Sequence, residues 1–130
     1  MQVEYFADVE PKLLLTWGDD PGDATTLRRA AQELAAHDVG YPVVVDQLPG
    51  FHGVDRCTLT AVTGNADRGL EPVGGSGQRF RCTLRPMSWE TVSEMLEPFE
   101  RERPEPRRET FQYLDENGPV LWIVSTDRAW

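Results

Sequence analysis

The segment 79–85 alternates arginine with apolar side chains along its length. Successive side chains of a β-strand point to opposite faces of its sheet. If the apolar side chains pack in the core, three guanidinium groups share the open face, namely Arg79, Arg81 and Arg85. A guanidinium group binds a carboxylate or a phosphate through two parallel hydrogen bonds. The segment therefore predicts either a binding site for a small anion or a solvated strand whose arginines pair with acids on neighbouring strands.

A histidine, an aspartate and a cysteine stand close together in residues 51–57. A cysteine is a nucleophile when a neighbouring base or cation lowers its pKa, and His52 is the nearest base to Cys57. Cys57 falls on the same alternate as Leu59 and Ala61, however, which predicts that its side chain is buried. Cys57 and His52 remain candidates for a nucleophile and its base, and the sequence predicts no catalytic centre around them.

The chain has two cysteines, and a hairpin of 57–63 with 79–85 would bring Cys57 and Cys82 face to face. A disulfide and a pair of buried thiols both fit that arrangement. The cysteines and histidines lack the short paired spacings of zinc ligands. The acidic turn 17–23 lacks the spacing of an EF-hand loop. We therefore expect no metal and no cofactor.

Carboxylates gather just before the first predicted helix, and two tryptophans lie near the end of the chain. Helix capping and a solvated turn account for the carboxylates, and core packing accounts for at least one tryptophan. Acidic and aromatic side chains are also the contacts that a basic partner protein would use. For such a partner we expect contacts from Asp19, Asp20, Asp23, Trp122 and Trp130.

The formal net charge of the 130 residues is -9. Binding to nucleic acid and to anionic membranes draws on clustered Lys and Arg, so we expect neither partner. The charge is unevenly distributed: residues 1–50 carry nine acidic and three basic side chains, whereas residues 51–86 carry three acidic and five basic. An acidic surface favours association with a basic protein. The first residues lack the pattern of a secretory signal, which favours a cytoplasmic location, and the preference for Arg over Lys favours a bacterial, high-GC source.

Two segments have the apolar spacing of amphipathic helices. The first begins at Asp23, which we expect to cap it, and ends before Gly40. The second begins at Ser88 as its cap, and Pro98 ends or bends it near Glu97. The other apolar runs predict strands at 2–7, 12–17, 41–47, 57–63, 79–85, 110–114 and 120–125.

The predicted order is β-β-α-β-β-β-α-β-β, and several connections are too short for parallel crossovers. We therefore expect one α+β domain over residues 1–130, with a mainly antiparallel sheet of about six or seven strands and both helices on one face. A ferredoxin-like core is one topology that fits this order. The function that these observations favour is that of a small, non-catalytic binding protein for a basic partner, in an inhibitor, immunity-type or accessory role. The alternative is a sensor or enzyme that binds an anion at Arg79, Arg81 and Arg85.

Overall fold

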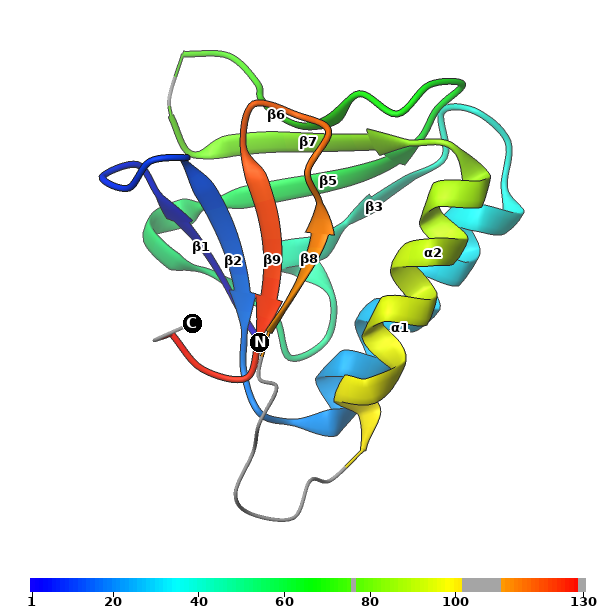
Figure 1. The fold of residues 1–130 in the computed structure, drawn as a ribbon, viewed down its shortest axis with the longest axis horizontal. Helices are drawn as coiled ribbons and strands as arrows, with labels where there is room; N and C mark the ends of the chain where they lie inside the picture. Colours follow the sequence, from blue (N-terminus) through cyan, green and yellow to red (C-terminus); the bar gives the residue numbers. More distant parts are fainter. Residues whose placement is uncertain (76, 102–110, 129–130) are drawn as a thin grey trace.

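The computed structural model describes residues 1–75, 77–101 and 111–128, which form two β-sheets beside a pair of helices (Figure 1). The five-stranded sheet consists, in spatial order, of β4 (His52–Gly53), β1 (Gln2–Phe6), β2 (Leu13–Trp17), β9 (Leu121–Ser125) and β8 (Phe111–Asp115). The four-stranded sheet consists of β3 (Pro42–Val44), β5 (Thr58–Thr63), β7 (Arg79–Leu84) and β6 (Gly69–Pro72). Figure 1 shows that the strands of the two sheets run in different directions.

The α+β class is confirmed, and the expectation of a single, mainly antiparallel sheet of about six or seven strands is matched only in part, because the strands form two sheets. Each sheet is mixed: β2 pairs in parallel with β9, and β5 pairs in parallel with β7. The described strands therefore do not form the one antiparallel sheet that a ferredoxin-like core requires.

The predicted hairpin of 57–63 with 79–85 does not form. Strand β6 lies between β5 and β7 in the chain and pairs antiparallel with β7, whereas β5 pairs with β7 in parallel. Sequence patterns missed β6 since it begins at Gly69 and ends at Pro72, two residue types that strands normally avoid. Proline is tolerated there because β6 is the edge strand of its sheet.

The cap of helix α1 (Pro21–Ala36) lies three residues earlier than the predicted cap, Asp23. The side chain of Asp20 accepts a hydrogen bond from the amide of Gly22 (2.8 Å), so Asp20 is the cap, and Pro21 takes the first helical position that proline favours. Asp23 lies in the first turn, where its carboxylate accepts a hydrogen bond from the amino group of Met1 (2.6 Å). The predicted apolar stripe is confirmed by the burial of Leu27, Ala30, Ala31 and Leu34.

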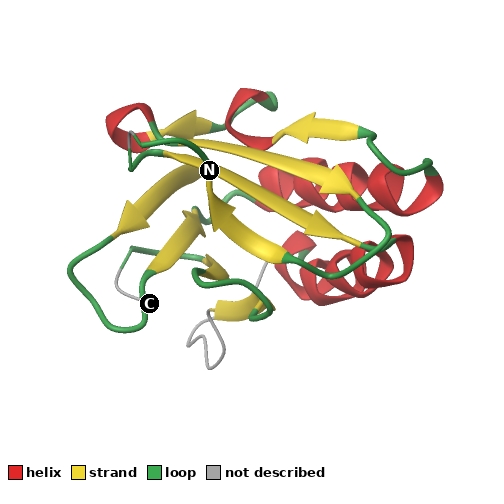
Figure 2. Cartoon of the chain, turned by 90° about the horizontal axis from the view of Figure 1, so that it is seen from above, coloured by secondary structure: helices red, strands yellow, loops and turns green. Residues whose placement is uncertain are grey.

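Helix α2 (Pro86–Leu96) also begins with proline at its first position, so Arg85, not Ser88, precedes it. The hydroxyl of Ser88 instead donates a hydrogen bond to Asp67 (2.8 Å). As Pro98 predicts, the α-helix ends at Leu96 and continues as a short 3₁₀ turn, η3 (Glu97–Glu100). The two helices lie side by side next to the strands (Figure 2).

One hydrophobic core joins both sheets and both helices into a single small domain. The indole of Trp89 donates a hydrogen bond to the carbonyl of Val62 (3.1 Å), which ties α2 to β5. The hydroxyl of Thr63 donates to the carbonyl of Leu34 (2.6 Å), which ties α1 to the same strand. In the described part of the chain, no helix is long and apolar enough to cross a membrane.

The segment 41–47 is a strand only in its first half, because η1 (Val45–Gln47) turns the chain away from the sheet. The carboxylate of Asp46 in this turn accepts a hydrogen bond from the amide of Leu59 (2.8 Å), so a side chain replaces the next backbone pairing.

Candidate functional site

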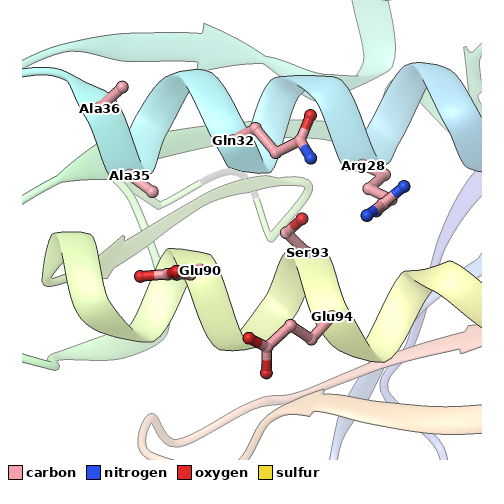
Figure 3. Close-up of a pocket in the computed structure, with 7 residues that line it drawn as sticks. All are labelled: Arg28, Gln32, Ala35, Ala36, Glu90, Ser93 and Glu94. Carbon is pink, nitrogen blue, oxygen red and sulfur yellow. The ribbon is translucent and has the colours of Figure 1, made fainter.

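A groove of about 350 Å³ runs between α1 and α2 (Figure 3). Its lining consists of Arg28, Gln32, Ala35 and Ala36 from α1 and Glu90, Ser93 and Glu94 from α2. The alanines and the serine are small, so the helix surfaces leave an open channel where longer side chains would fill it. This volume lies at the lower end of the range for ligand-binding clefts.

One buried group in this groove lacks the hydrogen bond that buried polar groups normally make. The Nε atom of Arg28 is buried and has no hydrogen-bond acceptor among the described residues. Ser93 is 4% exposed, and its side chain points toward α1. The terminal nitrogens of Arg28 are engaged, since one donates a hydrogen bond to Glu100 (2.7 Å). The groove thus offers one buried hydrogen-bond donor that has no acceptor in the described structure.

The α2 rim of the groove is acidic. Glu90 and Glu94 are exposed, lie four residues apart on one helix face, and form no ion pair with any described residue. We call residues 20–38 and 86–101 the helix layer; it contains eight acidic and three basic side chains. Its potential is therefore negative around the groove, which would attract a cation.

The structure separates one of the three arginines of the predicted anion site from the other two. Arg79 and Arg81 are exposed on the outer face of the four-stranded sheet, as the alternation predicts. Arg85 lies beyond the end of β7, and its guanidinium donates a hydrogen bond to Asp67 (3.1 Å). Arg85 thus pairs with an acid, but from the loop between β5 and β6 and not from a neighbouring strand. In the parallel register of β5 and β7, two threonines lie beside the two remaining arginines.

The candidate nucleophile Cys57 is buried, with 1% of its surface exposed, while the side chain of His52 is exposed. Burial, with the nearby charges of Asp46 and Glu4, raises the pKa of the Cys57 thiol to about 12. A thiol that stays protonated at neutral pH is a poor nucleophile.

Both cysteines are free and buried. Extension of the β5–β7 register places Cys57 level with Gln78, four residues from Cys82. At about 3.3 Å per residue, the two Cα atoms are about 13 Å apart along the strands. A disulfide requires about 7 Å or less, so the pair of buried thiols is the arrangement that the fold allows.

The expected partner contacts are placed in three different ways. Asp19 and Asp20 are exposed at the start of α1, whereas Asp23 is partly buried against Met1. Trp122 is 1% exposed, and its indole donates a hydrogen bond to the hydroxyl of Thr16 (3.0 Å). Its ring belongs to the core and is not an anchor at the surface. Trp130 lies outside the described residues.

Sequence reasoning missed the groove because its residues look like ordinary exposed helix positions. The sequence offered one signal. Glu90 and Glu94 place two negative charges one helical turn apart, and no basic residue lies between Glu90 and Glu97 to pair with them. The contribution of Arg28 and Gln32 depends on how α1 packs on α2, which only the fold reveals.

In the part of the chain that the structure describes, no cluster of three or more His, Cys, Asp or Glu side chains is arranged to hold a metal ion. Comparison of the chain with protein-family models, with curated proteins and with solved structures finds no match.

Proposed function

We propose that this protein is a binding protein that engages a basic partner protein through the interhelical groove and the surrounding helix layer. Its role would be that of an inhibitor, an immunity-type protein or an accessory subunit, and it would need no catalytic step. The observation that carries the proposal is the groove itself: Glu90 and Glu94, two carboxylates with no ion pair to any described residue, line it together with Ser93.

A basic polypeptide segment supplies what these carboxylates lack. The aliphatic stem of a Lys or Arg side chain fits over Ala35 and Ala36, and its cation reaches the carboxylates of Glu90 and Glu94. The carbonyl oxygens of the same segment can accept hydrogen bonds from Ser93. Charge-assisted hydrogen bonds of this kind are the stronger ones in proteins.

The negative charge of the helix layer raises the rate of such an association. Complementary potentials raise the rate of encounter, and salt screens them over about 8–10 Å. A partner bound in this way associates more slowly and more weakly as the salt concentration rises. Asp19 and Asp20, at the start of α1, extend the negative surface beyond the groove.

Affinity capture from native lysate of the source cells, with charge reversal in the groove, tests the proposal. The variant Glu90→Lys/Glu94→Lys should lose the captured protein, because it turns the acidic rim basic. The matched control Glu10→Lys/Glu116→Lys makes the same change in net charge at two exposed carboxylates outside the groove. It should keep at least half of the capture at moderate salt.

Two results would contradict the proposal. One is equal loss in the groove variant and in the control, which would show that only net charge matters. The other is capture that does not weaken between 50 mM and 500 mM salt, which would exclude an electrostatic partner.

A further inference from the structure

A second polar patch lies on the outer face of the four-stranded sheet, away from the helix layer. In the parallel register, Thr58 lies beside Arg79 and Thr60 beside Arg81. Neighbouring strands are about 4.8 Å apart and alternate residues on a strand about 6.6 Å apart. The four side chains therefore occupy an area that one small ligand spans. A groove of about 340 Å³ opens over them, and Val73 from the loop after β6 also lines it.

The donors of this patch have no acceptor in the described structure. The guanidinium groups of Arg79 and Arg81 form no hydrogen bond or ion pair with described residues, and neither do the hydroxyls of Thr58 and Thr60. Glu71 on β6 is the carboxylate opposite Arg81 in the register. No ion pair joins Glu71 to Arg81 among the described residues, and one oxygen of Glu71 is buried without a hydrogen-bond partner.

The chemistry of the donors selects the ligand. Two guanidinium forks and two hydroxyls present more donors than the two oxygens of a carboxylate can accept in good geometry. A phosphoryl group has three terminal oxygens and up to two negative charges. Residues 58–85 carry four basic and two acidic side chains, so this sheet is locally positive in an acidic protein. We infer that Arg79, Arg81, Thr58 and Thr60 bind the phosphoryl group of a small anionic ligand.

Titration with inorganic phosphate tests this site, with the side-chain Nε–H signals of the arginines followed by NMR at constant ionic strength. Phosphate should shift the signals of Arg79 and Arg81 along a saturating curve, and chloride should not. Arg79→Gln and Arg81→Gln should each weaken binding about tenfold, since each removes a charged hydrogen-bonding fork. Arg79→Lys keeps the charge and loses the fork, so it should bind more weakly than the native protein.

The control Arg29→Gln/Arg68→Gln removes two other exposed guanidiniums and should leave phosphate binding within twofold of the native value. Signal shifts that do not saturate, or equal shifts at Arg29 and Arg68, would overturn the inference. An equal loss of binding in the control variant would do the same. The site shares no residue with the interhelical groove, so its failure would leave the proposed partner binding untouched.

Discussion

Glu90 and Glu94 lie one turn apart on α2 and line the same groove, and neither carboxylate is paired with a cation in the described structure. Like charges at this spacing destabilise a helix by about 0.2–0.5 kcal/mol. A pair that costs stability and forms no ion pair with the described residues is better explained by binding than by folding. This relationship is the basis of the proposed function.

Neutralising the pair should therefore stabilise the protein. We expect Glu90→Gln/Glu94→Gln to raise the free energy of unfolding by about 0.2–0.5 kcal/mol in urea denaturation at low salt. The gain should shrink at high salt because salt screens exposed charges. Glu97→Gln serves as the control, since Glu97 already lies near Arg28 and Arg101 and should give no gain. A loss of stability in the double variant would show that these carboxylates support the fold.

Ser93→Ala should also stabilise the free protein. The substitution introduces the best helix former at a position inside α2. We expect a gain of about 0.5 kcal/mol in the free energy of unfolding, together with weaker partner capture. Thr91→Ala is a matched control on the exposed side of α2, where the hydroxyl donates to the carbonyl of Met87 (3.2 Å). A Ser93→Ala variant that is less stable than the native protein would contradict this reading of the groove.

Asp115 is 3% exposed and joins the two sheets. Its carboxylate accepts hydrogen bonds from the amide of Leu70 on β6 (3.0 Å) and from the backbone and side chain of Asn117 (3.2 and 2.8 Å). Asp115→Ala leaves these donors without an acceptor, so we expect a loss of about 2–4 kcal/mol in the free energy of unfolding. The exposed neighbour Glu116→Ala should change it by less than about 0.5 kcal/mol. Similar effects at the two positions would rule out a structural role for the Asp115 carboxylate.

Glu4 and Arg128 should make stability depend on pH. A hydrogen bond from Arg128 holds the pKa of Glu4 below its ordinary value of 4.5, although burial acts in the opposite direction. The unfolded chain therefore binds the proton first as the pH falls. The contribution of this pair is complete above about pH 4.5 and is lost as the pH falls through the folded pKa.

NMR titration of the Glu4 carboxyl carbon measures that pKa directly. In Arg128→Gln the pKa of Glu4 should rise toward its ordinary value, and the acid-induced loss of stability between pH 5 and pH 3 should become shallower. An unchanged pKa would mean that Arg128 does not bind Glu4 in solution.

The two cysteines should resist alkylation while the protein is folded. Burial raises the pKa of Cys57 to about 12 and raises that of Cys82 well above its ordinary value. Iodoacetamide reacts with thiolates, so we expect no labelling of either residue within an hour at pH 7.5, and complete labelling of both in urea. Mass spectrometry of tryptic peptides distinguishes the two positions. Rapid labelling of Cys57 in the folded protein would show that its thiol is reactive and would make Cys57 a candidate nucleophile again.

Local patterns predicted the helices and seven of the strands because apolar periodicity and proline act within a few residues. They did not predict the division into two sheets. The parallel pairing of β5 with β7 depends on β6, whose Gly69 and Pro72 carry no strand pattern. The candidate sites divide in the same way. The alternation of residues correctly predicted that Arg79 and Arg81 are exposed. The groove was not predicted because it depends on the contact between α1 and α2.

A small basic probe tests the central claim most directly. Nα-acetyl-lysine N-methylamide carries one cation and two carbonyl acceptors, and its norleucine analogue lacks only the cation. In an NMR titration, the lysine probe should shift the backbone amide signals of Gln32, Glu90 and Ser93 along one saturating curve, and the norleucine probe should not. Glu90→Gln/Glu94→Gln should weaken this binding about tenfold, since it removes both charged acceptors, while Glu10→Gln/Glu116→Gln should leave it unchanged. Equal shifts at exposed carboxylates throughout the protein, or unchanged binding in the groove variant, would contradict a binding site for a basic partner between the helices.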